Sequence, residues 1–169
     1  MYIVKANYKE DDCVNILTTA LKEIINNKTV IVCIGTDRCI GDSLGPIVGT
    51  MLKNSDYKYP VYGTLESPIH ALNIYEALSE IKKKHPDGLF LALDACLGDK
   101  ENIGTIQIRK GPILPGKGVG KTLPQTGDFS IVAIVDQIDE DIKFTFNNIR
   151  LNFIVEMSEI IATSIILAT

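Results

Sequence analysis

The sequence lacks several features that would place the protein in a specialised class. Its net charge is -4, with 17 Lys and Arg residues against 21 Asp and Glu residues, so composition gives no electrostatic reason to expect nucleic-acid binding. No apolar run approaches the roughly 18 residues that a membrane-spanning helix needs, and the first residues are too polar for a secretory leader. We therefore expect a cytoplasmic protein with no membrane and no nucleic-acid partner.

Cysteine and histidine are also scarce. The four cysteines form no CxxC pair and match no metal-site spacing, so reduced thiols are expected. The two histidines are His70 and His85, and none follows His85. Cys39 or Cys96 with His70 is a conceivable thiol nucleophile pair, but no motif supports it and buried inert cysteines are the commoner case.

What the sequence does contain is an alternation of apolar strands and amphipathic helices. A chain of 169 residues fits one domain, and we assign residues 1–169 to it. The alternation predicts a three-layer α/β/α sandwich with a mostly parallel, twisted sheet. The expected strands cover 30–35, 60–65, 89–94, 105–111 and 129–136, and the expected helices cover 12–27, 44–54, 67–85 and 147–168.

Two glycine-rich stretches resemble phosphate-binding loops and fail in detail. GTDRCIGDSLG, residues 35–45, does not have the GxGxxG order, and its aspartates would repel a phosphate. PGKGVGKT, residues 115–122, has proline where GxxxxGK[ST] requires glycine, and Pro124 disfavours the helix that should follow. The second stretch is better interpreted as a loop in which Gly118 and Gly120 allow close approach to a ligand. Lys121 would then be either a cation beside a site or a solvated loop lysine.

Asp42 and Asp94 are the main candidates for chemistry. Asp94 ends one apolar run and Asp42 comes shortly after another, so we expect both on loops at the carboxyl ends of strands, where open α/β sheets bind ligands. If the two strands are neighbours, the carboxylates face each other, and such a pair can supply the acid and the base for amide hydrolysis. They could equally chelate a divalent cation. The structural alternative is a helix cap for Asp42, or for Ser43 beside it, and a turn residue for Asp94.

His70 stands near the expected start of the helix over 67–85, at the end of another strand. It could enter the same crevice as a ligand or proton carrier. A purely structural histidine explains the position equally well.

Six segments together resemble a known family. In order they are GTDRCIGDSLGP, YGTLESPIHALN, ALDACLG, GPILPGKGVGK, LPQTGDFSI and NNIRLNFIVEMSEIIA. Over roughly Val30 to Ala162, the chain resembles a sporulation protein family related to the spore germination protease. It is more distantly similar to the hydrogenase maturation endopeptidases. The resemblance implies a phosphorylase/hydrolase-like fold.

The germination protease degrades small acid-soluble spore proteins and is regarded as an atypical aspartic-type peptidase with two essential aspartates. The resemblance places them at Asp42, in GDSLGP, and Asp94, in LDACL. It also implies a substrate-binding role for Gly118, Gly120 and Lys121, because PGKGVGK is similar to a protease segment near the active site. In the maturation endopeptidases a later histidine joins the two acids to bind nickel, a role that only His70 could fill here.

These expectations combine into one predicted function and one alternative. We predict an endopeptidase without a required cofactor that hydrolyses small spore proteins in the forespore or spore core by a two-aspartate mechanism. His70, Gly118, Gly120 and Lys121 would contact the substrate, and Lys121 or loop amides would stabilise the oxyanion. The alternative is a non-catalytic sporulation or regulatory module that binds a partner or a metal through the same crevice. The sequence leaves open whether copies form a homo-oligomer.

Overall fold

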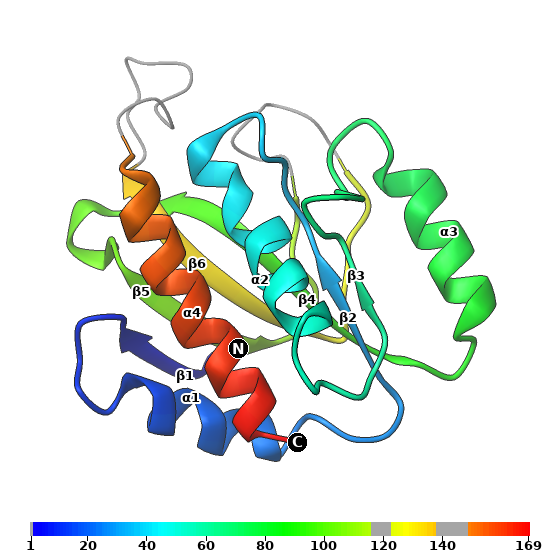
Figure 1. Cartoon of the computed structure of the whole chain (residues 1–169), viewed down its shortest axis with the longest axis horizontal. Coiled ribbons are helices and arrows are strands. Elements are labelled where there is room, and N and C mark those ends of the chain that lie inside the picture. Colours follow the sequence, from blue (N-terminus) through cyan, green and yellow to red (C-terminus); the bar gives the residue numbers. More distant parts are fainter. Residues whose placement is uncertain (1, 116–122, 138–148) are drawn as a thin grey trace.

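The computed structural model describes residues 2–115, 123–137 and 149–169 (Figure 1). These residues form a six-stranded sheet in the order β1-β5-β6-β4-β2-β3. Strands β3, β2, β4 and β6 run parallel, whereas β5 is antiparallel to β6 and β1 is antiparallel to β5. The mostly parallel sheet expected from the sequence is confirmed. The strand bounds are β1 Tyr2–Asn7, β2 Thr29–Cys33, β3 Val61–Tyr62, β4 Leu89–Gly98, β5 Thr105–Lys110 and β6 Phe129–Gln137.

Helices cover both faces of the sheet. Helices α1 (Cys13–Lys22), α2 (Leu44–Lys53) and α4 (Leu151–Leu167) pack on one face and are drawn in front of it in Figure 1. Helix α3 (Ile74–Lys84) packs on the other face beside β2 and β3. Two short 3-10 turns, η1 (Ile40–Ser43) and η2 (Lys100–Asn102), follow β2 and β4. The described residues therefore form the expected α/β/α sandwich.

Strand β2 shows why a continuous apolar run marks the centre of this fold. All five of its residues are buried. Ile31 and Cys33 belong to the core beneath α1, α2 and α4, whereas Val30 and Val32 belong to the core beneath α3. Because successive side chains of a strand point to opposite faces, only a strand covered on both sides needs apolar residues at every position.

The helix expected over 67–85 begins later than the sequence pattern suggests, at Ile74. Asn73 holds the preceding residues in a turn, since its side-chain oxygen accepts the His70 amide at 2.8 Å and its side-chain nitrogen donates to the Pro68 carbonyl at 2.9 Å. Asparagine competes with helix formation through such local hydrogen bonds. His70 therefore lies in a turn before α3 and not in its first turn.

Other boundaries also differ from expectation. The helix expected over 12–27 ends at Lys22, and Ile24 and Ile25 pack into the core from the turn that follows. The strand expected over 60–65 is reduced to two residues, and β1 at the edge of the sheet was not predicted. Within residues 2–115, 123–137 and 149–169, none of the helices has the length and apolar character needed to cross a bilayer.

Candidate active site

Asp94 lies inside β4, Leu89–Gly98, so the expectation that it lies on a loop at the end of the strand is wrong. Strand β4 continues to Gly98 because its second half pairs with β6, where Asp94 stands opposite Val132. Its neighbour β2 ends earlier, with Cys33 opposite Leu93. Asp94 is thus the first residue of β4 beyond the paired end of β2, and the expected adjacency of the strand that precedes Asp42 and the strand that carries Asp94 is confirmed. Its side chain faces the α3 side, between Ala92 and Cys96.

Asp42 lies close to the end of β2 because backbone hydrogen bonds join the two ends of the loop between them. The Thr36 amide donates to the Asp42 carbonyl at 3.0 Å, and the Asp42 amide donates to the Cys39 carbonyl at 3.1 Å. Gly35 makes this closure possible, because it has φ +140° and a Cβ there would stand 2.0 Å from the Asp42 carbonyl oxygen. A Cβ on Gly45 would similarly lie 2.1 Å from the Ile34 carbonyl oxygen. These glycines let η1 and the start of α2 press directly against the strand end.

The two carboxyl groups are held in an environment that separates their protonation states. Burial raises the pKa of Asp42 to about 6, although a hydrogen bond from the Thr36 backbone lowers it in part. Burial raises the pKa of Asp94 well above its usual range, and the negative charge of Asp42 raises it further, against a smaller lowering by the Ala95 backbone. At pH 7 Asp42 is therefore mainly ionised, whereas the environment of Asp94 disfavours its ionised form.

The structural alternative for these aspartates does not hold in the described residues. Ser43 occupies the N-cap position of α2, but no side chain there makes a capping hydrogen bond, and its hydroxyl donates instead to the Ile40 carbonyl at 2.6 Å. Asp94 is not a turn residue, because it lies in β4. Neither local role explains why a carboxyl group occupies these positions.

His70 reaches the same edge of the sheet but is engaged locally. The preceding residue, Ile69, forms a parallel bridge with Ile34 and accepts the Gly35 amide at 2.8 Å, so this loop runs beside the one that carries Asp42. The Nδ1 atom of His70 accepts the Leu72 amide at 3.2 Å. The ring therefore closes its own turn.

The remaining candidates have mixed outcomes. Gly118, Gly120 and Lys121 lie outside the described residues, so their expected contact with substrate stays a prediction. All four cysteines are free. Burial and the Asp94 charge raise the pKa of Cys96 to about 11, against a lowering by Arg109, so its thiol is neutral at pH 7. In the part of the chain that the structure describes, no cluster of three or more His, Cys, Asp or Glu side chains is arranged to hold a metal ion.

Polar side chains on the same sheet face were missed by sequence analysis. Gln107 of β5 is only 4% exposed and pairs with Val132 of β6, which in turn pairs with Asp94 of β4. Gln107 and Asp94 therefore lie in the same row of residues across the sheet. Its side-chain oxygen accepts from two nitrogens of the Arg109 guanidinium, with the Nε contact at 3.1 Å. Fully buried Ser130 stands opposite Arg109, and its hydroxyl has no hydrogen-bond partner among the described residues. The alternation of polar and apolar residues in TIQIRK could have predicted these polar side chains on one face of the strand.

The fold and the site together define an α/β-sandwich protein with two interacting carboxyl groups at the carboxyl edge of its parallel strands. The chain belongs to the DUF1256 family, described as proteins of unknown function, whose family model matches residues 3–164. It is similar to the uncharacterized protein YyaC of Bacillus subtilis (strain 168), with 43% identity over 148 residues, covering 87% of this chain and 72% of that protein.

Proposed function

We propose that the protein is an endopeptidase that cleaves small proteins through Asp42 and Asp94. The observation that carries this proposal is the interacting pair of carboxyl groups at the carboxyl edge of the adjacent strands β2 and β4, with the pKa of Asp42 raised to about 6 and that of Asp94 raised by burial and by the Asp42 charge. Water-mediated amide hydrolysis requires two close carboxyl groups of which one is ionised and the other keeps its proton. The resemblance to the germination protease supports the substrate class, namely small spore proteins in the forespore or spore core.

In the proposed reaction, the Asp42 carboxylate accepts a proton from a water molecule as that water attacks the scissile carbonyl carbon. The Asp94 carboxyl group donates its proton to the carbonyl oxygen, so that no free oxyanion accumulates. Asp42 then passes its proton to the amide nitrogen, the carbon–nitrogen bond breaks, and Asp94 recovers its proton from the new acid. Lys121 and the glycine-loop amides remain candidates for further stabilisation of the oxygen.

The charge balance of the site also supports catalysis over passive binding. In the described residues no salt bridge neutralises either carboxyl group, and no cation contributes to either pKa shift. A site evolved only to hold a basic partner side chain would gain from two ionised carboxylates, whereas burial here disfavours ionisation of Asp94. A neutral carboxylic acid is useful as a proton donor.

The test is cleavage of purified small acid-soluble spore proteins, followed by gel electrophoresis and mass spectrometry. Asp42→Asn and Asp94→Asn should each lower kcat/KM by roughly 10²- to 10⁴-fold, the usual contribution of a general acid or base. Asp37→Asn is the matched control, because Asp37 is exposed in the same loop as Asp42. Cleavage that survives both active-site substitutions contradicts the proposal. A folded wild-type protein that cleaves nothing favours the non-catalytic binding module.

The pH dependence of kcat/KM gives a second, independent readout. The acid limb should have its midpoint near 6, where Asp42 becomes ionised. The alkaline limb should report loss of the Asp94 proton, and Asp94→Asn should abolish that limb in any residual activity. A profile that stays flat between pH 5 and pH 7 contradicts the assignment of Asp42 as the base.

A further inference from the structure

Two neighbouring hollows lie at the opposite edge of the sheet from the carboxyl pair. The first, about 340 Å³, is lined by the end of α2, the loop that follows it and β3. The second, about 210 Å³, is lined by the start of β2 and the segment between α3 and β4. Pro60 lines both hollows, so they adjoin each other, and together we describe them as a groove. The lining residues are Asn27–Val30, Leu52, Lys53, Tyr57, Tyr59–Tyr62 and His85–Gly88.

The groove is floored by aromatic rings held in fixed positions. Tyr57 and Tyr59 pack edge to face, with ring centroids 5.6 Å apart. The Tyr62 hydroxyl and Nε2 of His85 are hydrogen-bonded at 2.8 Å, which links a wall of the first hollow to a wall of the second. Rigid tyrosine and proline surfaces bind extended peptides at little cost in side-chain entropy, because few rotatable bonds must be ordered.

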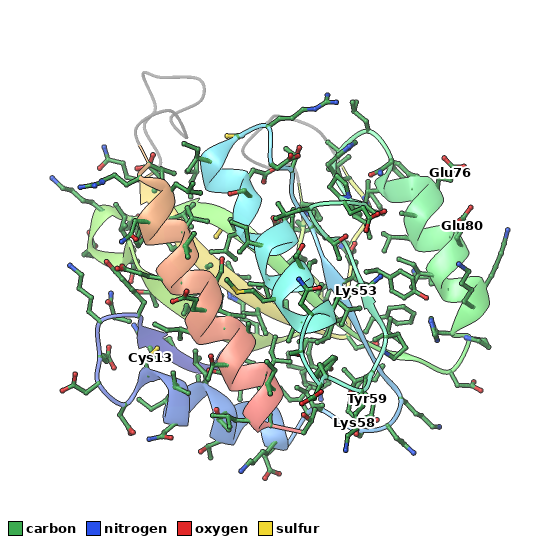
Figure 2. The ribbon with its side chains drawn as sticks, in the orientation of Figure 1. Cys13, Lys53, Lys58, Tyr59, Glu76 and Glu80 are labelled. Atoms are coloured by element: carbon green, nitrogen blue, oxygen red, sulfur yellow. The ribbon has the colours of Figure 1, made fainter. Side chains whose placement is uncertain are left out.

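Charge at the groove has the sign opposite to that of the whole chain. Among the lining residues Lys28 and Lys53 are cationic and Asp87 is anionic. With the residues that flank this lining, segments 27–30, 52–62 and 82–88 contain six lysines and two aspartates, an excess of four positive charges in a chain of net charge -4. Lys58 lies beside Tyr59 in the loop after α2, and Lys53 is the last residue of α2 (Figure 2). Lys82, Lys83 and Lys84 form the last turn of α3, next to His85. Such a patch attracts negative charge and disfavours basic partners.

We propose that this groove, which we call the amino-edge groove, binds an acidic, extended polypeptide segment. Its two hollows would take two side chains of the segment, the tyrosine rings would pack on its apolar groups, and the lysines would pair with its carboxylates. The proposal rests on the proposed function in one respect: the segment would belong to the protein that the carboxyl pair cleaves. The groove would then act as a second anchoring point for substrate.

Peptide is favoured over nucleic acid as the occupant for two reasons. Two separate hollows suit two side chains of an extended peptide better than a continuous phosphate backbone. The chain as a whole is acidic, so a long polyanion would be repelled once it extended beyond the groove.

The test uses fluorescence anisotropy with three labelled probes. The first is a decapeptide of glutamate, proline and tyrosine, the second has glutamine in place of every glutamate, and the third is a twelve-residue oligothymidylate. Wild type should bind the acidic peptide at least tenfold more tightly than either other probe at low salt, and the preference should shrink as salt rises. Equal binding of the glutamine peptide, or tighter binding of the oligothymidylate, overturns the proposal.

Charge reversal tests the location. Lys53→Glu/Lys58→Glu should weaken the acidic peptide about tenfold or more, because two attractions become repulsions. Lys5→Glu/Lys9→Glu is the matched control, since both residues are exposed lysines at the β1 edge. Thermal melting of each variant checks that the fold is intact. An unchanged affinity in the groove variant, or an equal loss in the control, overturns the assignment.

Binding and cleavage can be separated. The anisotropy measurements are repeated with Asp94→Asn, whose groove is intact, so a protein without peptidase activity still tests the groove. If cleavage occurs, Lys53→Glu/Lys58→Glu should raise KM for substrates with an acidic segment and leave kcat unchanged. Cleavage with an unaltered KM in that variant overturns the groove proposal alone.

Discussion

Replacing Asp42 by asparagine should make the protein more stable at neutral pH, although it should remove activity. The folded state raises the pKa of this carboxyl group from 3.8 to about 6, because ionisation in its half-buried position is unfavourable. Each pKa unit corresponds to about 1.4 kcal/mol, so the ionised group costs at most about 3 kcal/mol of folding free energy at pH 7.5. Asparagine carries no charge and retains an oxygen that can accept the Thr36 amide.

The direction in which stability changes with pH follows from proton binding by the folded and unfolded states. Between about pH 4 and pH 6 the folded state holds the Asp42 proton and the unfolded state has lost it, so stability falls as pH rises through this window. Wild type should therefore lose stability between pH 4.5 and pH 7.5, and Asp42→Asn should lose less. The difference in unfolding free energy between Asp42→Asn and wild type at pH 4.5 should therefore be about a third of the difference at pH 7.5.

The assay is urea unfolding at both pH values, supported by thermal melting. Allowing for partial solvation of Asp42, we expect a gain of about 1 to 3 kcal/mol at pH 7.5, or roughly 3 to 10 °C in Tm. Asp37→Asn, in the exposed part of the same loop, should change little. A variant that is less stable than wild type at pH 7.5, or a gain of equal size at both pH values, would refute the reasoning.

Three further outcomes test other parts of the site. Gly35→Ala should destabilise the fold by about 2 kcal/mol or more in urea, since its Cβ would meet the Asp42 carbonyl oxygen, whereas Gly111→Ala, also at positive φ but with open space around it, should cost less. Cys96→Ser should leave cleavage unchanged, and maleimide should react slowly with Cys96 at pH 7.5, because its pKa of about 11 leaves almost no thiolate. Asp94→Asn should also stabilise the protein, with the gain growing toward alkaline pH in urea titrations, since burial and the Asp42 charge raise the pKa of Asp94 and make its ionisation unfavourable in the folded state.

The sequence predicted those parts of the fold whose local pattern and tertiary environment agree. The continuous apolar run of β2 is buried on both faces, and a strand of this kind has few alternatives. The helix after it, expected over 44–54, is α2, Leu44–Lys53. The predicted start of a helix was wrong where a single side chain redirected the backbone, as Asn73 does before α3. Such local hydrogen bonds have no periodicity, so pattern analysis does not detect them.

Only part of the candidate site could be predicted, because local sequence pattern marks the aspartates but does not show how distant strands pair. The positions of Asp42 and Asp94 at the ends of apolar runs indicated two carboxyl groups at the carboxyl ends of neighbouring strands, and the adjacency of β2 and β4 is confirmed. The position of Asp94 inside β4 was missed, because the extra length of that strand is set by pairing with β6, which lies far along the sequence. The link between Gln107 and Arg109 also depends on that pairing, which aligns β5 with the Asp94 row.

The two proposed sites place a requirement on any shared substrate. Gly88 lines the amino-edge groove and Asp94 lies six residues further along β4, so the two sites are about 20 Å apart along the strand. A substrate that occupies both sites must follow the protein surface between them, and this path is longer than the straight distance of about 20 Å. It therefore requires roughly ten or more extended residues. A compact folded domain cannot supply such a segment without unfolding, whereas a disordered small protein can. The combination therefore favours disordered small proteins as substrates and predicts that shortening the link between acidic segment and scissile bond will abolish the contribution of the groove.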